Sequence, residues 1–516
     1  MKFAAEFSSL LPLNLYTVYN NIYQLFGNLW HLAITEDAPL QEPVSKDGQL
    51  CSGVLTTSDL MFMVMAAAAP MAVVVALMPM AFAFGNGAGV PAVYLGSAIA
   101  LLLFATGYVR IIPYVRNAGA FYAYISASFG KTCGLAAAYI AAISYFLLCA
   151  STVGALAFFA GELFERATGL AVRWEVWAAL GIGLIAYLSY RRITVAAKVL
   201  SIALVAEVAL LSALDLAILH SQGLGMFTLG PFTPSIVFSP GLGIAAIYGF
   251  NGLIGVEGTA IYQEEARDRE RTIPRATYLS VVAIGSFYVI TGWCLVVGVG
   301  AQNDISAIAR SDPGRFIVGQ ITRYMGTSAA FILSFLVVTS AFASALALFN
   351  NATRYLYALA RDGVLPRSLA RTHSRHQSPH VACALLTMVM LAVFMGSSIA
   401  RLDPLLNIST ALAGVGSVGL MALLATTALG IPVFFIRRRI WDIRVTLAPT
   451  MGGLIIAIAT LLAVRNYAAI TGVTSETINN LPVGLVAIAL IGICQARWLL
   501  KSRPATFHGI GSNRVD

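Results

Sequence analysis

Long apolar segments separated by short polar loops recur along the chain from Leu60 to about residue 500. Each is close to the roughly 20 residues that a helix needs to cross a bilayer. The fold class expected from this pattern is an all-α polytopic membrane protein. The pattern predicts about twelve membrane-spanning helices, at 58–83, 91–109, 131–160, 174–190, 194–219, 241–265, 276–300, 324–359, 380–399, 404–434, 445–464 and 481–500.

Loops on alternate sides of these segments differ in positive charge. The loops 85–91 and 220–240 carry no Lys or Arg, whereas the other set, which we call the arginine-rich side, holds Arg110, Arg116, Arg191, Arg192, Arg267, Arg269, Arg271, Arg275, Arg361, Arg367, Arg371, Arg375, Arg437, Arg438, Arg439, Arg444, Arg497, Lys501 and Arg503. Lys and Arg favour the cytoplasmic side of a membrane. Both termini are therefore predicted to be cytoplasmic, with an N-terminal tail at 1–57 and a C-terminal tail at 501–516.

The first 33 residues are apolar and aromatic but contain Pro12 and several Asn, and no basic region leads into a sustained apolar core. A signal peptide is therefore not expected. One hypothesis is that residues 1–33 are an upstream extension, with Ile34 marking an alternative start. The alternative is a mobile or interfacial tail.

Composition narrows the class of protein further. The chain is 59% hydrophobic and 11% charged, against roughly 45–50% and about 25% in soluble domains. The net charge of +9 follows from the positive-inside bias, so nucleic acid is not an expected partner.

The six cysteines form no CxxC pair, and Pro379 interrupts the run of His373, His376 and His380, so no metal site is expected. Without a phosphate-binding GxxxxGK[ST] loop or a catalytic constellation, neither a cofactor nor an enzyme activity is predicted.

Two of the predicted helices are interrupted. The sixth contains Phe250-Asn251-Gly252-Leu253-Ile254-Gly255, and the first contains Pro70 within Ala66–Met71. Proline removes a helix hydrogen bond and clashes with the preceding turn. The two interruptions are five spans apart, so they have opposite orientations. Paired broken helices in two inverted halves indicate a transporter binding site, and the expected halves are 58–219 and 241–434, with two further helices at 445–500.

Three motifs on this framework resemble one family. They are EEARDRERTIPRA at 264–276, FNNATRYLYALARDGVLP at 349–366 and, more weakly, NAGAFYAY at 117–124. In this order on twelve spans they resemble the amino acid–polyamine–organocation (APC) superfamily of secondary transporters, of the amino acid permease type. The resemblance implies a 5+5 inverted-repeat, LeuT-like fold, alternating access and usually amino acid substrates. One departure is that the first span reads AAAAPM where the family often has a glycine-serine-glycine type break.

The broken helices supply the candidate substrate-binding residues. Half-helix N-termini suit a substrate carboxylate, and carbonyl groups of unwound backbone suit an ammonium group or a cation. Pro70 has no N–H and offers only a carbonyl. The alternative is that Gly252 and Gly255 merely permit close helix packing. The candidates are Ala68, Ala69 and Met71 on the first span and Phe250, Asn251, Gly252 and Ile254 on the sixth.

Two carboxylates within the apolar spans are candidates for proton coupling. Glu257 follows the sixth-span break, and its position resembles that of a proton-sensing glutamate in some family members. Glu207 lies about 18–20 Å from either end of the fifth span, near the membrane midplane. An ionised carboxylate at such depth is costly unless it is paired or protonated. The alternatives are a structural hydrogen bond at Glu257 and a permanently protonated, hydrogen-bonded Glu207.

The eighth span and its end hold two further candidate sites. Thr339, Ser340 and Ser344 match hydroxyls that form a cation site in sodium-coupled relatives, although such hydroxyls usually bond to their own helix. Glu264 and Glu265 could form an inner gate with Arg354 and Arg361. The alternative for these charges is a static ion-pair cluster at the headgroup level.

These observations predict a secondary active transporter of the cytoplasmic membrane that carries an amino acid or related organic cation by proton symport. The expected partners are the small-molecule substrate, which is amino acid or polyamine-like, and the lipid bilayer. Two alternatives remain. One is a substrate exchanger of the same fold, and the other is a transporter-derived nutrient sensor.

Overall fold

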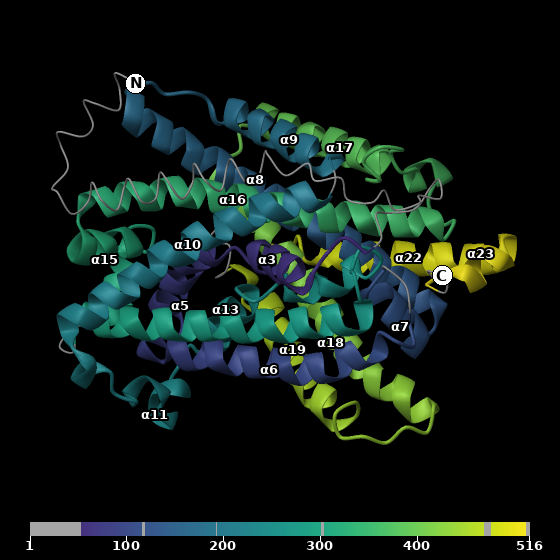
Figure 1. Cartoon of the computed structure of the whole chain (residues 1–516), viewed down its shortest axis with the longest axis horizontal. Coiled ribbons are helices and arrows are strands. Elements are labelled where there is room, and N and C mark those ends of the chain that lie inside the picture. Colours follow the sequence, from purple (N-terminus) through teal and green to yellow (C-terminus); the bar gives the residue numbers. More distant parts are fainter. Residues whose placement is uncertain (1–52, 116–118, 192, 301–303, 469–475, 512–516) are drawn as a thin grey trace. The chain divides into compact units, whose positions relative to one another are not determined.

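A computed structural model describes residues 53–115, 119–191, 193–300, 304–468 and 476–511. All of these belong to one compact unit, Asp47–Asp516. The predicted N-terminal tail lies outside the described residues up to position 52, and so does the expectation about residues 1–33. Most of the described chain is helical (Figure 1).

Within the described ranges, ten helices of 17 residues or more and two interrupted spans account for the twelve predicted spans. The first span comprises α3 (Thr57–Ala67), α4 (Pro70–Ala72), η1 (Val73–Leu77) and α5 (Met78–Phe84), and the sixth comprises α12 (Leu242–Asn251) and η5 (Val256–Tyr262). The others are α6 (Val90–Ile111), α8 (Lys131–Thr168), α9 (Trp174–Tyr190), α10 (Ile193–Gln222), α13 (Arg269–Val299), α16 (Thr327–Arg361), α17 (His380–Ile399), α18 (Ala411–Arg437), α19 (Leu447–Arg465) and α22 (Val483–Ser502).

Shorter helices connect these spans, and one follows the last of them. They are η2 (Gly87–Gly89), α7 (Phe121–Phe129), η3 (Leu224–Met226), η4 (Gly230–Phe232), α11 (Pro234–Val237), α14 (Ile305–Ser311), α15 (Phe316–Met325), η6 (Arg367–Ala370), η7 (Pro404–Thr410), α21 (Glu476–Asn479) and α23 (Pro504–Gly509).

Eleven of the twelve predicted spans correspond, within the described ranges, to helical segments that are long and apolar enough to cross a membrane. The expected span at 174–190 is the apolar helix α9, whose 17 residues are at the lower limit of about 17–25 for a membrane helix. Several boundaries differ. α13 begins at Arg269 and not at residue 276, and α8 extends to Thr168 and not to residue 160. At the eighth span, Gly326 adopts φ +85° and separates α15 from α16, so this span begins at Thr327 and not at residue 324.

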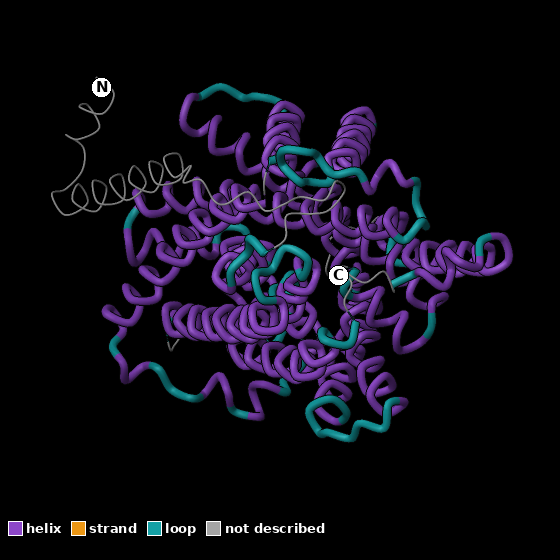
Figure 2. The backbone as a smooth tube through the Cα atoms, turned by 45° about the vertical axis from the view of Figure 1, so that its right-hand side comes forward, coloured by secondary structure: helices purple, strands orange, loops and turns teal. Residues whose placement is uncertain are grey.

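Small residues bring the long helices together. α8 packs against α16 and α18, which Figure 1 labels, and Figure 2 shows that nearly all of the described chain is helical. A Cβ atom on Gly416 would lie 2.9 Å from the backbone oxygen of Ser144, and one on Gly419 would lie 2.0 Å from the Ser144 hydroxyl. Membrane helices approach this closely only where such small residues line the contact.

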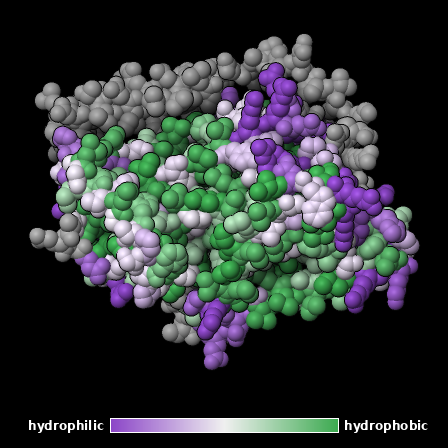
Figure 3. Space-filling model, turned by 90° about the horizontal axis from the view of Figure 1, so that it is seen from below, coloured by the Kyte–Doolittle hydropathy of each residue, from purple (hydrophilic) through white to green (hydrophobic). Residues whose placement is uncertain are grey.

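The surface matches a lipid-facing bundle. On the face shown in Figure 3, hydrophobic side chains cover a broad central region, and hydrophilic ones gather toward the right-hand end and the lower edge. Large apolar side chains such as Leu180, Met388, Leu461 and Ile491 are mostly exposed. An apolar patch of this extent is not stable in water, so it indicates contact with lipid.

Candidate functional site

The first span breaks where the sequence predicts it. α3 ends at Ala67, and Ala69 adopts a left-handed conformation with φ +50° before Pro70 begins the next helical segment. This conformation costs a non-glycine residue roughly 1–2 kcal/mol. Such strain persists where the surroundings impose it, which is common at ligand-binding sites.

The sixth span breaks at the predicted glycines. α12 ends at Asn251, and after a turn Gly255 adopts φ +115°, beyond which the chain continues as the 3₁₀-helix η5. Glycine has no Cβ and reaches this region without strain. The two half-helices are thus separated by irregular backbone at 252–255.

The two breaks lie against each other. A Cβ atom on Gly255 would be 3.1 Å from both the Ala67 Cβ and the Ala68 nitrogen. One on Gly252 would be 2.9 Å from a methyl group of Val73. The structure therefore brings together the two segments that the sequence predicts as binding elements. They can approach this closely because Gly252 and Gly255 have no side chain.

The predicted substrate-binding residues surround this contact and are mostly buried. Ala68, Ala69, Met71, Phe250 and Ile254 are each less than 7% exposed. Backbone N–H groups at the two breaks already form hydrogen bonds. The Met71 N–H donates to the Glu207 carboxylate. The Gly252 N–H donates to the Tyr248 carbonyl, and the Ile254 N–H donates to the Asn251 carbonyl. The Asn251 amide oxygen accepts a hydrogen bond from Ser417 of α18 at 2.8 Å.

Glu207 lies deep in α10 and is only 2% exposed. Its Oε2 atom accepts a hydrogen bond from the Met71 backbone N–H at 3.3 Å and another from the Ser340 hydroxyl at 2.9 Å. The carboxylate therefore connects three elements, namely the first-span break, α10 and α16. Hydrogen bonds to an ionised acceptor are stronger than those between neutral groups, so loss of its charge weakens this connection.

Glu257 is buried in η5 on the other side of the break. Its carboxylate accepts a hydrogen bond from the Gly255 N–H at 2.8 Å and one from the Tyr145 hydroxyl of α8 at 3.0 Å. Its backbone oxygen accepts another from the Tyr108 hydroxyl at 2.7 Å. These bonds hold the unwound segment in place, as the structural alternative for Glu257 requires.

The three hydroxyls of the eighth span point to different partners. Ser340 donates to Glu207, and Ser344 donates to the Ala67 carbonyl at the end of α3, at 3.0 Å. Thr339 instead donates to the Leu336 carbonyl of its own helix. Ser344 therefore contacts the first-span break directly, Ser340 is connected to it through Glu207, and Thr339 bonds to its own helix.

The four predicted gate residues form two ion pairs. Arg354 makes two hydrogen bonds of 2.8 Å to the Glu265 carboxylate, and both side chains are almost fully buried. Arg361 lies 2.7 Å from Glu264. The Arg354 guanidinium also stacks on the Tyr262 ring, which favours the charged form.

Backbone pairing closes the same end of the molecule. Leu55, just before α3, forms an isolated parallel bridge with Ala266, just after η5. The Leu55 N–H donates to the Glu265 carbonyl, and the Arg267 N–H donates to the Leu55 carbonyl, both at 2.9 Å. The first and sixth spans are thus joined at the arginine-rich side.

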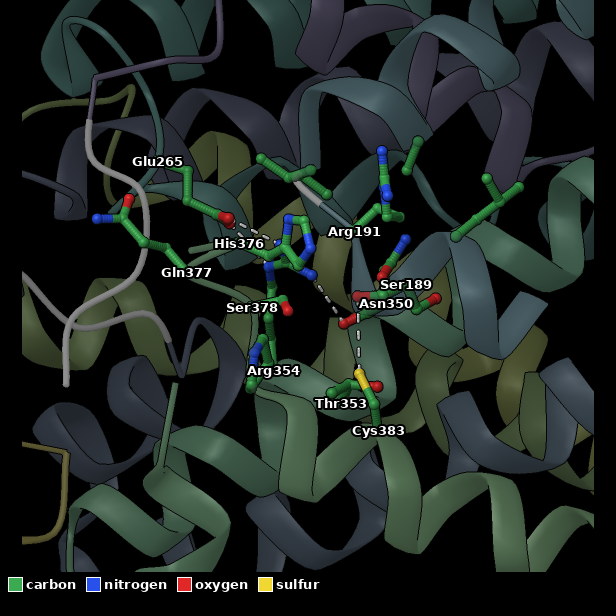
Figure 4. Close-up of a pocket in the computed structure, with 14 residues that line it drawn as sticks. Ser189, Arg191, Glu265, Asn350, Thr353, Arg354, His376, Gln377, Ser378 and Cys383 are labelled. Atoms are coloured by element: carbon green, nitrogen blue, oxygen red, sulfur yellow. Dashed lines mark hydrogen bonds and ion pairs between the residues drawn. The ribbon is translucent and has the colours of Figure 1, made fainter. Parts of the chain in front are cut away.

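A small recess, open in part to solvent, borders this closed end (Figure 4). It lies where the end of α9, α16 and the start of α17 meet, and Arg191, His376 and Asn350 line it together with the Arg354–Glu265 pair. The recess is therefore beside the candidate gate, not at the contact between the two breaks.

Several site residues were not singled out from the sequence. Tyr145 and Tyr108 carry no local signal, because their partner Glu257 is more than 100 positions away. Asp215 could have been noticed, since it is an acidic residue within the same apolar span as Glu207. Within the described ranges, no group of three or more His, Cys, Asp or Glu side chains is placed to hold a metal ion.

Comparison with known proteins gives a family model described as amino acid permease, which matches residues 59–506. The chain is 26% identical over 313 residues to the low-affinity putrescine importer PlaP of Escherichia coli K12, a match that covers 58% of this chain and 66% of PlaP. It is 28% identical over 176 residues to the lysine-specific permease LysP of Lactococcus lactis, which covers 34% of this chain and 32% of LysP. The matched part is thus slightly less than two thirds of PlaP.

Two solved structures show the same fold at low sequence identity. Mhp1, a nucleobase-cation-symport-1 family transporter in a closed conformation with bromovinylhydantoin bound, matches with a TM-score of 0.51, 16% identity, and coverage of 90% of this chain and 97% of Mhp1. MhsT in complex with L-phenylalanine matches with a TM-score of 0.52, 18% identity, and coverage of 82% of this chain and 100% of MhsT. At these identities the likeness shows the fold, which is LeuT-like.

Proposed function

Because the chain belongs to the amino acid permease family, we propose that it is a proton-coupled symporter of an amino acid or a polyamine-like organic cation. The protein is a multi-pass secondary transporter with a LeuT-like fold and is not an enzyme. We place it in the cytoplasmic membrane, with both termini on the cytoplasmic side. The arginine-rich loops support this orientation.

The position of Glu207 is the observation that carries the proposal. Its carboxylate accepts hydrogen bonds from the first-span break and from α16, and these are elements that must separate if the site opens to one side. A protonated carboxyl group loses its charge and becomes a donor, so binding a proton changes the connection between these elements. A proton moved across 100 mV of membrane potential contributes about 2.3 kcal/mol. We propose Glu207 as the principal coupling residue.

Glu257 is the second candidate for coupling. Both hydrogen bonds to its carboxylate come from residues that fix the sixth-span break. That arrangement favours a structural role, in which Glu257 maintains the unwound backbone beside the substrate.

The substrate site is proposed at the contact between the two breaks, among Ala68, Ala69, Met71 and residues 250–254. Carbonyl groups of unwound backbone and two neighbouring carboxylates favour a substrate with an ammonium group. The names of PlaP and LysP, a putrescine importer and a lysine-specific permease, agree with that chemistry. We take residues 58–219 and 241–434 as the two inverted repeats that move around this site.

Alternating access requires two ends that open in turn. At the arginine-rich end we propose that the Glu265–Arg354 and Glu264–Arg361 pairs separate together with the Leu55–Ala266 bridge. At the opposite end, Gly85 and Gly241 are in close contact, since a Cβ on Gly241 would lie 2.4 Å from the Gly85 carbonyl oxygen. We take these contacts at the two ends as those of an occluded state of the transport cycle.

A substrate screen followed by flux measurements tests the proposal. Putrescine, lysine, branched-chain amino acids and nucleobases are added to the purified protein to find which raise its melting temperature, and the stabilising compound is then followed as a labelled substrate in proteoliposomes. Uptake driven by an imposed proton gradient supports symport. Uptake only against internal substrate would identify an exchanger, and binding without flux would identify a sensor.

A further inference from the structure

A third buried carboxylate, Asp215, lies on α10 between Glu207 and the end of the helix opposite the arginine-rich side. Eight residues separate the two carboxylates, which is about 12 Å along the helix. The Asp215 side chain is 8% exposed, and its Oδ2 accepts a hydrogen bond from the Thr291 hydroxyl of α13 at 2.7 Å. The Cys294 thiol lies beside the same carboxylate. Among the described residues no nitrogen or oxygen donor reaches its Oδ1, so the weakly donating Cys294 thiol is the other donor at this carboxylate.

Tyr288 lies between the two carboxylates. It is one turn before Thr291 on α13, and its side chain is fully buried within electrostatic reach of Glu207. In the described part of the chain its hydroxyl group has no hydrogen-bond partner. A buried tyrosine hydroxyl usually finds a partner, so this group is positioned to bond with a water molecule.

The polar groups continue from Asp215 toward the end of α10. The Gln320 amide oxygen of α15 is buried beside Gly298 and Ile218, about one turn beyond Asp215, and it also has no partner in the described ranges. Beyond it, the Tyr324 hydroxyl donates to the Gly298 carbonyl at 2.6 Å and accepts from the Gln222 amide at 2.9 Å. Both of these last side chains are only half-buried, so the line of polar groups reaches the surface.

Three polar atoms on three helices, none with a nitrogen or oxygen partner within the described chain, require an explanation. A buried polar atom that remains dry is costly, and buried polar groups of this kind are normally satisfied by ordered water. A purely structural role for Asp215 is met by the bonds from Thr291 and Cys294 and does not account for Tyr288 or Gln320. Water along this line would connect the surface with Glu207.

We propose that Asp215, Tyr288 and Gln320 form a water-linked route by which the coupling proton reaches Glu207 from the side opposite the arginine-rich loops. The proposal rests on the proton symport described above. A proton from external water passes to the Asp215 carboxylate, and the protonated group then releases a proton through water and the Tyr288 hydroxyl to the Glu207 carboxylate. Asp215 returns to its initial state in each cycle, so no further reactant is needed.

The charged and titratable groups facing this route come from three helices. α13 contributes Tyr288 and Cys294, α15 contributes Tyr324 and Arg323, and α6 contributes Tyr94, whose ring centroid lies 5.3 Å from that of Tyr288. Arg323 is exposed and donates to the Gly298 carbonyl, so solvent screens its charge. At the inner end, the first span and α16 contribute the Met71 amide and the Ser340 hydroxyl that bind Glu207.

Asp215→Asn tests the route in proteoliposomes. We expect proton-driven uptake to fall at least tenfold and to lose its dependence on external pH, while substrate exchange at equal pH on both sides continues at a rate within twofold of the wild type. Asp215→Glu should restore proton-driven uptake in part, since it retains a carboxylate. Asp312→Asn, the same change at an exposed loop position on α14's C-terminal side, is the matched control and should behave as the wild type.

Full proton-driven uptake by Asp215→Asn with an unchanged pH profile would overturn the route while leaving the proposed symport intact. Absence of proton-driven uptake in the wild type would instead refute the symport itself. If Asp215→Asn does not fold, Tyr288→Phe removes only one oxygen atom from the route. It should slow proton-driven uptake severalfold at equal melting temperature, and wild-type rates in this variant would also overturn the proposal.

Discussion

The Glu207 carboxylate accepts a hydrogen bond from the Met71 backbone N–H, with 3.3 Å between the oxygen and the nitrogen. The two residues are 136 positions apart and belong to α10 and to the first-span break. Met71 follows Pro70, which begins a new helical segment after the break. The first N–H groups of a helix have no carbonyl acceptor in a preceding turn. Glu207 supplies the acceptor that one of these groups needs, so a titratable side chain of α10 is hydrogen-bonded directly to the broken helix.

Glu257 gives a prediction that separates coupling from structure. The two bonds to the Glu257 carboxylate go to different oxygens, Oε2 for the Gly255 N–H and Oε1 for the Tyr145 hydroxyl. Glu257→Gln keeps one oxygen to accept from the Gly255 N–H, and its amide NH2 can donate to the Tyr145 hydroxyl, which accepts as well as donates. We therefore expect its uptake to stay within about threefold of the wild type and to keep its pH dependence, whereas Glu257→Ala should abolish uptake because the break loses its acceptor. Uptake measured between pH 5 and 8 distinguishes the two roles. A loss of pH dependence in Glu257→Gln would make Glu257 the coupling residue.

The contact between the breaks predicts the effect of adding one methyl group. Gly255→Ala places a Cβ 3.1 Å from Ala67 and Ala68 and forces alanine to adopt φ +115°, which costs on the order of 1–3 kcal/mol. We expect a lower melting temperature and uptake below a tenth of the wild type. Gly96→Ala is the control, because Gly96 is exposed on α6 and a Cβ added there would meet no atom within 4 Å. Equal effects of the two changes would argue against a close contact at the breaks.

The gate pair predicts a large loss of stability. Glu265→Ala leaves the buried Arg354 guanidinium without its carboxylate, and breaking such a pair costs about 3–5 kcal/mol. The double variant Glu265→Ala/Arg354→Ala should lose less than the sum of the two single changes. Denaturant unfolding in detergent measures these differences. The exposed pair Asp268–Arg271, 3.6 Å apart, is the control, and its loss should cost less than about 1 kcal/mol.

The choice of coupling ion gives a further prediction. Of the hydroxyls considered for a cation site, Thr339 bonds to its own helix, and Ser340 is engaged by Glu207. We expect uptake at a fixed proton gradient to be unchanged when choline replaces sodium, and Thr339→Ala to match the wild type. A requirement for sodium that Ser344→Ala abolishes would instead place a cation between the Ser344 hydroxyl and the Ala67 carbonyl.

The sequence alone anticipates the spans, both breaks and the depth of Glu207, because hydropathy, proline, glycine and buried charge are local signals. It also indicates that residues 264–265 and the end of α16 carry opposite charges, although their pairing as Glu265–Arg354 and Glu264–Arg361 depends on how two distant helices meet. The bond from Tyr145 to Glu257 joins residues 112 positions apart. No periodicity in the chain encodes such a contact, since it is determined by the packing of α8 against the sixth span.

Proton movement in Glu207→Gln tests the central claim most directly. Proteoliposomes containing a pH-sensitive dye report proton influx when the substrate found in the screen is added outside, and the labelled substrate is counted in the same sample. The wild type should acidify the interior together with substrate uptake. Glu207→Gln should exchange substrate without acidification and should not concentrate it under a proton gradient. Acidification coupled to substrate uptake in Glu207→Gln, at the wild-type ratio, would contradict the account.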